Sequence, residues 1–155
     1  MSVAAILQAA RARGILIATA ESCTGGMVSA ALTDVAGSSA MFDRGFVTYT
    51  NAAKMQVLGV RAATLEAHGA VSEQVAAEMA QGALAHSAAT LAVAITGIAG
   101  PGGSEHKPEG RVCFAIATPD RCTTQTVEFG ALGRAQVRQA ARDHALGVLL
   151  AALTP

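Results

Sequence analysis

Two short, uninterrupted apolar segments constrain the fold of this 155-residue chain more than any other feature. Residues 15–20 (ILIATA) follow Gly14, and residues 91–96 (LAVAIT) precede Gly97. A strand that is covered by helices on both faces of its sheet is continuously apolar, whereas a strand with one solvated face alternates. Both segments therefore predict central strands of a parallel sheet that is buried on both faces.

Segments with helical periodicity separate these strands. Apolar residues recur at helical spacing near the N-terminus, and the same pattern with capping signals predicts helices over about 26–35, 52–58, 72–86 and 133–153. Further strands are predicted over 42–50, 111–118 and 123–129. This order predicts a single α/β domain over residues 1–155, a three-layer α/β/α sandwich with a mixed, mostly parallel sheet of about five strands.

Composition excludes several classes of protein. Hydrophobic residues make up 52% of the chain and charged residues 14%, which argues against disorder. Eleven basic and eleven acidic residues cancel, so no nucleic-acid partner is expected. No apolar run reaches the length of a membrane span and no signal peptide is recognised, so we expect a cytoplasmic protein without a membrane partner. The three cysteines and four histidines show no metal-ligand spacing, so no metal is expected.

The first candidate site is the turn AESCTGG over residues 20–26, which joins a predicted strand to a predicted helix. Ligands of open α/β sheets bind beyond the carboxyl ends of the strands, and helix N-termini favour negative charge. Ser22 is either a nucleophile that faces these backbone amides or only the N-cap of the helix. The substrate contacts expected from this turn are Cys23, Thr24, Gly25 and Gly26. Cys23 is an alternative nucleophile, although a buried thiol is the simpler interpretation.

Two further segments carry possible chemistry. The glycine-rich segment after residue 96 matches neither a Walker loop nor a Rossmann fingerprint, but Thr96, Gly97 and Gly100 can line a site with backbone groups. Lys54, one of only two lysines, lies in the first turn of a predicted helix, where the macrodipole disfavours a cation and lowers the lysine pKa. Lys54 is thus either a neutral base or an ordinary exposed lysine.

Taken together, several separated motifs resemble the CinA C-terminal domain family across essentially the whole chain. They are residues 19–26 (TAESCTGG), 37–39 (GSS), 45–54 (GFVTYTNAAK), 68–72 (HGAVS) and 96–101 (TGIAGP). The resemblance implies hydrolysis of nicotinamide mononucleotide to nicotinic acid mononucleotide and ammonia. It also implies a three-layer fold with one antiparallel strand, a homo-oligomer, a nucleotide as the small-molecule partner, and no metal or organic cofactor.

The resemblance also assigns roles to residues. It makes Ser22 the nucleophile and Lys54 its base, with Tyr49 orienting Lys54 or relaying the proton. Further phosphate or ribose contacts are expected from Gly37, Ser38, Ser39, Arg44 and Arg138. Arg138 belongs to a stripe on the last helix, with Arg134 and Arg142, that is either a solvated face or an anion contact. Two alternatives stay open: a nucleotide-binding regulatory module without turnover, and an amidase for a related pyridine amide.

Overall fold

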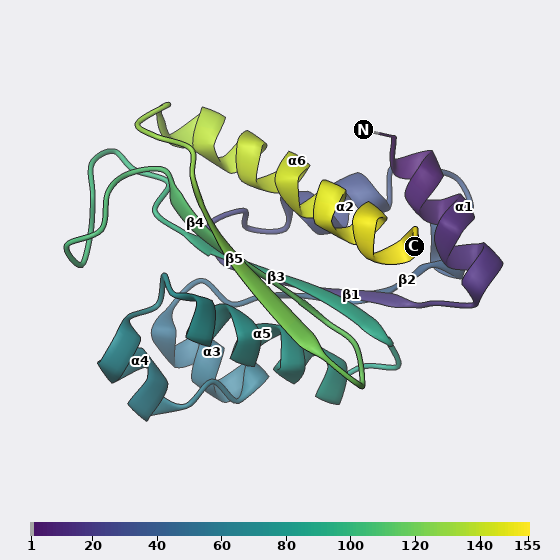
Figure 1. The fold of residues 1–155 in the computed structure, drawn as a ribbon, viewed down its shortest axis with the longest axis horizontal. Helices are drawn as coiled ribbons and strands as arrows, with labels where there is room; N and C mark the ends of the chain where they lie inside the picture. The colour runs from purple at the N-terminus through teal and green to yellow at the C-terminus, as the bar shows by residue number, and fades with distance from the viewer. Residues whose placement is uncertain (1) are drawn as a thin grey trace.

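The computed structural model describes residues 2–155, in which one sheet lies between two layers of helices (Figure 1). The strands are β1 (Ile17–Glu21), β2 (Phe42–Val47), β3 (Leu91–Gly97), β4 (Arg111–Ala117) and β5 (Cys122–Glu128). The helices are α1 (Val3–Arg13), α2 (Met27–Leu32), α3 (Asn51–Leu58), α4 (Ala62–His68), α5 (Glu73–Ala85) and α6 (Arg134–Leu153), with a 3-10 turn at Ser38–Ala40.

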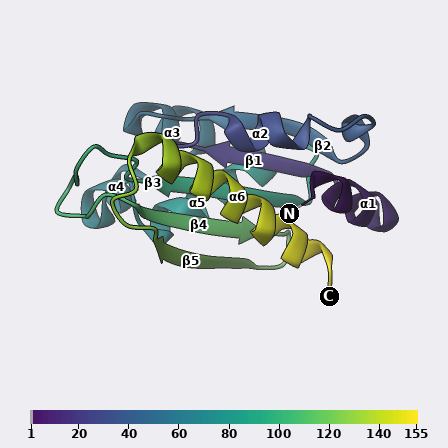
Figure 2. The ribbon, with the colours of Figure 1, turned by 90° about the horizontal axis from the view of Figure 1, so that it is seen from above.

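The sheet has the strand order β2-β1-β3-β4-β5 (Figure 2). β1 pairs in parallel with β2 and β3, whereas β4 pairs antiparallel with both β3 and β5. Four strands therefore share one direction and β4 alone is reversed, which confirms the predicted mixed sheet. Two of the four strand pairings are parallel and two are antiparallel. The antiparallel pairings arise because β3, β4 and β5 follow one another without a crossover helix.

The two helical layers cover chemically different faces of the sheet. Helices α1, α2 and α6 lie on one side, and α3, α4 and α5 lie on the other (Figure 1). Because successive side chains of a strand alternate between faces, each central strand divides its residues between these layers. The bulky residues pack toward α1, α2 and α6: Ile17, Leu91, Val93, Ile95, Val112 and Phe114. Small residues pack toward α5: Ala18, Ala20, Ala92, Ala94, Ala115 and Ala117.

The small residues let α5 approach its neighbours closely. Gly82 in α5 lies against the backbone of α3, and a Cβ at this position would overlap with the carbonyl oxygen of Leu58. The alanine and glycine residues of this layer therefore allow α5 to pack closely against the sheet and against α3.

Helix α4 was not predicted from the sequence. Its N-cap residue, Arg61, provides no side-chain cap, so no local signal marks its start. Glu78 of α5 supplies the missing acceptor: it accepts hydrogen bonds from the Arg61 amide at 2.8 Å and from the Thr64 hydroxyl at 2.6 Å. A cap that comes from another helix leaves no trace in the local pattern.

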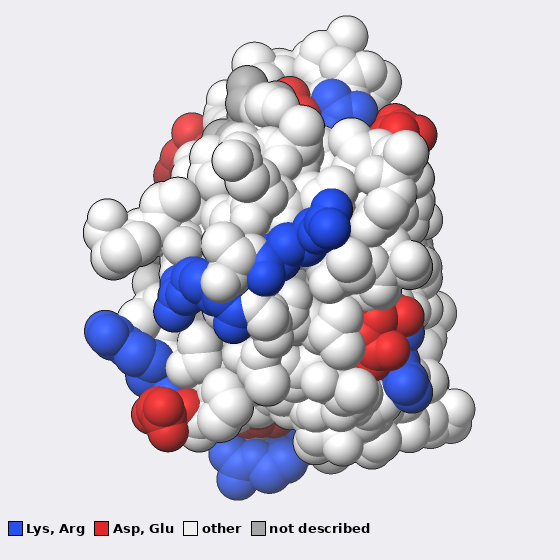
Figure 3. Space-filling model, turned by 90° about the vertical axis from the view of Figure 1, so that its right-hand side faces the viewer, with Lys and Arg blue, Asp and Glu red and all other residues white. Residues whose placement is uncertain are grey.

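The end of the molecule that bears α1 and the C-terminus is mixed in charge. Basic and acidic side chains are interspersed there with wide neutral areas (Figure 3). In the described part of the chain, no helix is long and apolar enough to cross a bilayer.

Candidate active site

A pocket of about 370 Å³ opens at the carboxyl ends of β1, β2 and β3. Its walls come from the turn after β1, the segment between β2 and α3, the segment between α4 and α5, the loop between β3 and β4, and the start of α6. The lining side chains that carry polar or charged groups are Ser22, Cys23, Tyr49, Asn51, Lys54, Thr96, Ser104, Glu105 and Arg134. This is the edge of an open α/β sheet where ligands usually bind.

Ser22 and Lys54 meet at the bottom of this pocket. Ser22 follows the last residue of β1, and its amide donates to Ile95 O of the neighbouring strand at 2.9 Å. Lys54 lies in the first turn of α3, and its Nζ is 3.0 Å from Ser22 Oγ. Residues far apart in sequence thus form a hydroxyl–amine pair, and the Lys54 side chain is only 1% exposed.

Burial lowers the pKa of Lys54 from its ordinary value, because a charged ammonium loses its hydration in this position. The Glu105 carboxylate acts in the opposite direction, as would a Cys23 thiolate at high pH, but both are smaller influences than burial. The amine is therefore shifted toward the neutral form that a base requires.

Three oxygen atoms lie within hydrogen-bond distance of Lys54 Nζ, enough for the three N–H groups of an ammonium or for the groups of a neutral amine. Besides Ser22 Oγ, the nitrogen contacts two backbone oxygens, Thr48 O and Tyr49 O, each at 3.0 Å. A neutral amine has two N–H groups and one lone pair. The two carbonyls can accept both N–H groups, which leaves the lone pair directed at the Ser22 hydroxyl.

Tyr49 contacts Lys54 through its backbone rather than through its phenol. The Tyr49 side chain is 55% exposed at the mouth of the pocket. Its hydroxyl accepts a hydrogen bond from Arg134 Nη2 at 2.6 Å, and Arg134 Nη1 donates to Gly100 O at 2.7 Å. The Tyr49 phenol therefore bonds to Arg134 and not to Lys54, whereas the Tyr49 carbonyl oxygen bonds to Lys54 Nζ.

The N-terminus of α2 is already occupied by a carboxylate. Glu21 is fully buried, and its Oε1 accepts from Thr24 Oγ1 at 2.7 Å, Gly26 N at 3.2 Å and Val28 N at 3.0 Å. Its Oε2 accepts from Ser29 N at 2.9 Å and Ser29 Oγ at 2.7 Å. The expectation that this helix end holds a ligand anion is corrected, because Glu21 takes the amides that a phosphate would need.

The amides of Cys23 and Thr24 remain available in this turn. Gly25 N donates to Ser22 O and Gly26 N to Glu21, but within residues 2–155 no acceptor bonds to the Cys23 and Thr24 amides. Gly25 and Gly26 have φ values of 56° and 105°, which only glycine adopts readily. Neither glycine lines the pocket, so both serve the turn rather than the ligand.

We expect Glu21→Gln to destabilise the fold by about 2–4 kcal/mol, because an amide nitrogen cannot accept the hydrogen bonds that one carboxylate oxygen accepts now. Urea unfolding of both proteins measures the difference. The matched control is Glu66→Gln on α4, an exposed acid whose replacement should change stability by less than about 0.5 kcal/mol. A change of similar size in both variants would show that the Glu21 network does not stabilise the turn.

Cys23 is not a credible nucleophile. Its thiol is 4% exposed, and burial, the largest influence, raises its pKa to about 12. At neutral pH the reactive thiolate is therefore absent. Cys23 lines the pocket as a small apolar group beside Ser22.

The predicted residues of the third strand and its loop do reach the pocket. Thr96 is buried, and its hydroxyl donates to Ala70 O at 2.9 Å, which ties β3 to the segment before α5. A Cβ at Gly97 would lie 3.1 Å from Cys23 Sγ and 2.7 Å from a Val112 methyl group, so this position has no room for a side chain. Gly100 forms part of the rim, where its carbonyl holds Arg134.

Arg138 supports the catalytic turn without lining the pocket. Its Nε donates to Cys23 O at 3.0 Å and its Nη2 to Thr24 O at 3.4 Å. These bonds hold α6 against the turn after Ser22. Arg138 therefore holds the turn against α6 and does not line the pocket, and its direct contact with substrate stays a prediction.

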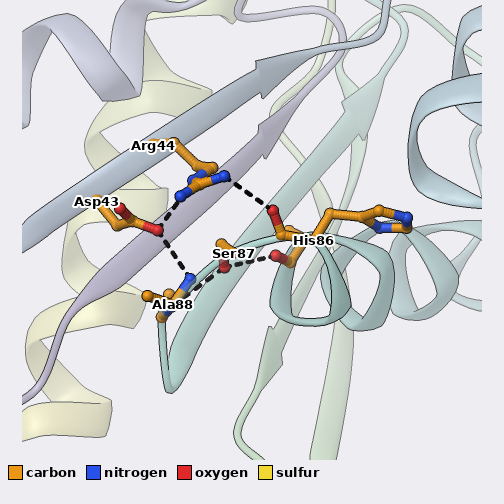
Figure 4. Close-up of polar contacts among 7 residues, drawn as sticks. Asp43, Arg44, His86, Ser87 and Ala88 are labelled. Carbon is orange, nitrogen blue, oxygen red and sulfur yellow. Dashed lines mark hydrogen bonds and ion pairs between the residues drawn. The ribbon is translucent and has the colours of Figure 1, made fainter.

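Four predicted contacts lie at the opposite end of the sheet. Gly37, Ser38 and Ser39 precede β2, whose first residue pairs with the first residue of β1. Arg44 bonds to Asp43 Oδ2 at 2.9 Å and to His86 O at 3.2 Å, while Asp43 also accepts from Ala88 N (Figure 4). Asp43 and Arg44 thus join β2 to the connection between α5 and β3. None of the four predicted residues lines the pocket, and their contact with the substrate stays a prediction.

Arg134 and Glu105 are the charged pocket residues that the sequence did not mark as part of the site. Arg134 belongs to a stripe of three arginines spaced four residues apart, and only its place at the first turn of α6 could have distinguished it from Arg138 and Arg142. Glu105 lies in the long loop between β3 and β4, where no sequence pattern marks it as a site residue. Among residues 2–155, no three histidine, cysteine, aspartate or glutamate side chains gather in a way that would hold a metal ion.

Comparisons with known proteins show the family to which this chain belongs. The model of the CinA C-terminal domain matches residues 2–153. The nicotinamide-nucleotide amidohydrolase PncC of Escherichia coli (strain K12) is 63% identical over 112 residues, which are 72% of this chain and 68% of that protein. The enzyme with the same name from Enterobacter agglomerans is 56% identical over 123 residues, or 78% of this chain and 75% of the relative.

Solved structures agree with the sequence matches. The competence/damage inducible protein CihA from Agrobacterium tumefaciens superposes with a TM-score of 0.93 at 48% identity, covering 99% of this chain and 93% of that one. A CinA superfamily protein from Escherichia coli gives a TM-score of 0.92 at 40% identity, with 96% and 86% covered. With a family model that spans nearly all of its length, this chain belongs to the CinA C-terminal domain family.

Proposed function

We propose that this protein hydrolyses the carboxamide of nicotinamide mononucleotide, releasing ammonia and nicotinic acid mononucleotide, with Ser22 as nucleophile and Lys54 as general base. The observation that carries the proposal is the buried amine of Lys54, 3.0 Å from Ser22 Oγ, inside a pocket at the carboxyl ends of the strands. The names of the relatives from Escherichia coli and Enterobacter agglomerans support the substrate.

The first half of the reaction forms an ester. Neutral Lys54 takes the proton of the Ser22 hydroxyl while Ser22 Oγ attacks the carboxamide carbon, which gives a tetrahedral intermediate. Collapse of this intermediate breaks the C–N bond. The Lys54 ammonium returns its proton to the departing nitrogen, so ammonia leaves and a nicotinoyl ester of Ser22 remains.

The second half uses the same groups on water. Lys54, neutral again, takes a proton from a water molecule, and the resulting hydroxide attacks the ester carbon. The bond to Ser22 Oγ breaks, and the proton on Lys54 passes to the serine oxygen. The product is released as a carboxylic acid, which gives its proton to water or to the released ammonia and becomes a carboxylate, and the site regains its starting state.

The developing oxyanion needs donors close to Ser22. The amides of Cys23 and Thr24 fit this role, because they lie directly after the nucleophile and have no acceptor within the described residues. Arg138 holds the carbonyl oxygen of Cys23, which shares a peptide group with the Thr24 amide, and so keeps that amide oriented. The Cys23 amide shares its peptide group with Ser22 O, which accepts from Gly25 N at 3.0 Å. Preorganised donors of this kind commonly contribute a factor of about 10²–10³ to kcat.

Arg134 is the candidate contact for the substrate phosphate. It is exposed at the rim of the pocket, where Tyr49 and Gly100 hold its guanidinium in place. A planar guanidinium binds phosphate in a bidentate manner. Arg134 therefore replaces Arg138 in the role that the sequence suggested.

Ammonia release across a small panel of compounds tests this function. We expect kcat/KM for the mononucleotide to exceed that for the riboside by about two to four decades, because two charge-assisted contacts of about 1.5–3 kcal/mol each are lost with the phosphate. Equal values would favour an amidase for other pyridine amides. Tight binding of the nucleotide with no ammonia release would favour the non-catalytic module.

A further inference from the structure

The pocket contains one carboxylate that the mechanism does not use. Of the residues that line it, Glu105 alone is acidic. Within residues 2–155 no donor bonds to its carboxylate and no cation pairs with it. The nearby Lys107 is engaged elsewhere, because its ammonium donates to His68 O at 2.7 Å and Val71 O at 2.6 Å.

The backbone holds Glu105 in an unusual conformation. Glu105 and His106 have φ values of 52° and 62°, in the left-handed region that non-glycine residues rarely occupy. They form a two-residue turn closed by Ser104 N to Lys107 O at 2.9 Å and Lys107 N to Ser104 O at 2.8 Å. A two-residue hairpin turn of this kind requires positive φ at both central residues, so this turn fixes the direction in which the Glu105 side chain leaves the backbone.

The turn places the carboxylate on a particular wall of the pocket. It lies against Gly69, after α4, so closely that a Cβ at Gly69 would overlap with Glu105 Oε2. Arg134 belongs to α6, in the helical layer on the other face of the sheet (Figure 1). The pocket therefore has an acidic wall and a basic rim on different sides, with Ser22 and Lys54 between the two layers.

The proposed substrate has the complementary pattern. An N-ribosylated pyridine ring carries a fixed positive charge, and the phosphate carries negative charge. We propose that the Glu105 carboxylate binds the cationic ring and selects N-ribosylated pyridinium amides over uncharged amides, as a specificity-determining residue. This inference rests on the proposed function, because it assigns a contact to that same substrate.

Binding to the Ser22→Ala protein tests the contact without turnover. We expect Glu105→Gln on this background to raise the Kd of nicotinamide mononucleotide about threefold to tenfold in calorimetry. The Kd of the reduced mononucleotide, whose dihydropyridine ring is uncharged, should stay unchanged. Glu66→Gln is the matched control, since Glu66 is an exposed acid outside the pocket and should alter neither value.

The pH profile of the active enzyme adds a second readout. The Glu105 charge raises the Lys54 pKa. Glu105→Gln should therefore move the rising limb of kcat to lower pH, which a loss of loop structure alone would not do. The proposal would be overturned if Glu105→Gln raised the Kd values of the mononucleotide and the reduced mononucleotide equally, or raised neither. A wild-type protein that binds neither nucleotide would also overturn it.

The two proposals fail in different ways. A wild-type protein that binds the mononucleotide but releases no ammonia contradicts the proposed function only, since the Kd comparison still decides the role of Glu105. Rapid turnover of the mononucleotide by a Glu105→Gln enzyme with unchanged Kd contradicts the role of Glu105 only.

Discussion

Ser22→Ala is expected to lower kcat for nicotinamide mononucleotide by at least about 10³-fold, because the ester intermediate can no longer form. The fold should survive. The Ser22 hydroxyl contacts only Lys54 among the described residues, and the Ser22 amide keeps its bond to Ile95 O. Ammonia release measures the activity, and the urea midpoint measures the stability.

Ser87→Ala provides a matched control for this substitution. Ser87 lies after α5 at the far end of the sheet, where its hydroxyl donates to Ala83 O (Figure 4). Its loss removes the same oxygen atom from the protein but should leave kcat unchanged. A folded Ser22→Ala protein with ammonia release close to that of the wild type would exclude Ser22 as the nucleophile.

Replacement of Lys54 is expected to have an effect of similar size. Lys54→Met keeps the length of the side chain but has no lone pair that can take the Ser22 proton, so kcat should fall at least about 10³-fold. Lys54→Arg keeps the positive charge and should be equally inactive, since arginine, with a pKa above about 12, does not deprotonate. Substantial turnover by Lys54→Arg would reduce the role of Lys54 to an electrostatic one.

The lowered pKa of Lys54 also predicts how stability depends on pH. In the window between this lowered pKa and the unfolded value of about 10.4, the unfolded protein binds a proton that the folded protein lacks. The free energy of unfolding therefore rises with pH across this window and levels off above it. Relative to Lys54→Met, the wild type should gain stability as pH rises. A difference between them that is independent of pH would mean that Lys54 is not shifted.

Kinetics should follow the same titration. The wild-type kcat rises with pH through the Lys54 pKa, because only the neutral amine accepts the serine proton. The midpoint of this rise in kcat should lie at a pH below about 10.4, the pKa of an exposed lysine. A flat profile over this range would indicate that another group, or another step, controls the rate.

The sequence predicted the elements whose signals are local. The apolar segments at 15–20 and 91–96 specify β1 and β3, because strands buried on both faces need no alternation. Gly59 ends α3 in the left-handed conformation, and Ser72 caps α5 through a bond from Val75 N at 3.2 Å. Both ends can be located from residue type alone, since each cap lies within its own segment.

Features that depend on a partner from another element were not predictable in this way. Helix α4 begins where Glu78 of α5 caps it. The sequence does not show what Glu21 binds, whereas the fold turns its carboxylate onto the N-terminus of α2. In both cases the decisive partner comes from the three-dimensional path of the chain.

The residues of the candidate site also divide into those with a local sequence signal and those that only the fold brings together. Residue types and motifs by themselves predicted the α/β architecture. Local features made Ser22 and Lys54 candidates, each with an ordinary alternative, and the family resemblance assigned their roles. Only the tertiary structure decided that the two meet 3.0 Å apart and that Arg44 belongs to the far end of the sheet. It also brought Arg134 and Glu105 to the pocket. Their neighbours are set by the crossover of strands and the packing of helices, which no local pattern encodes.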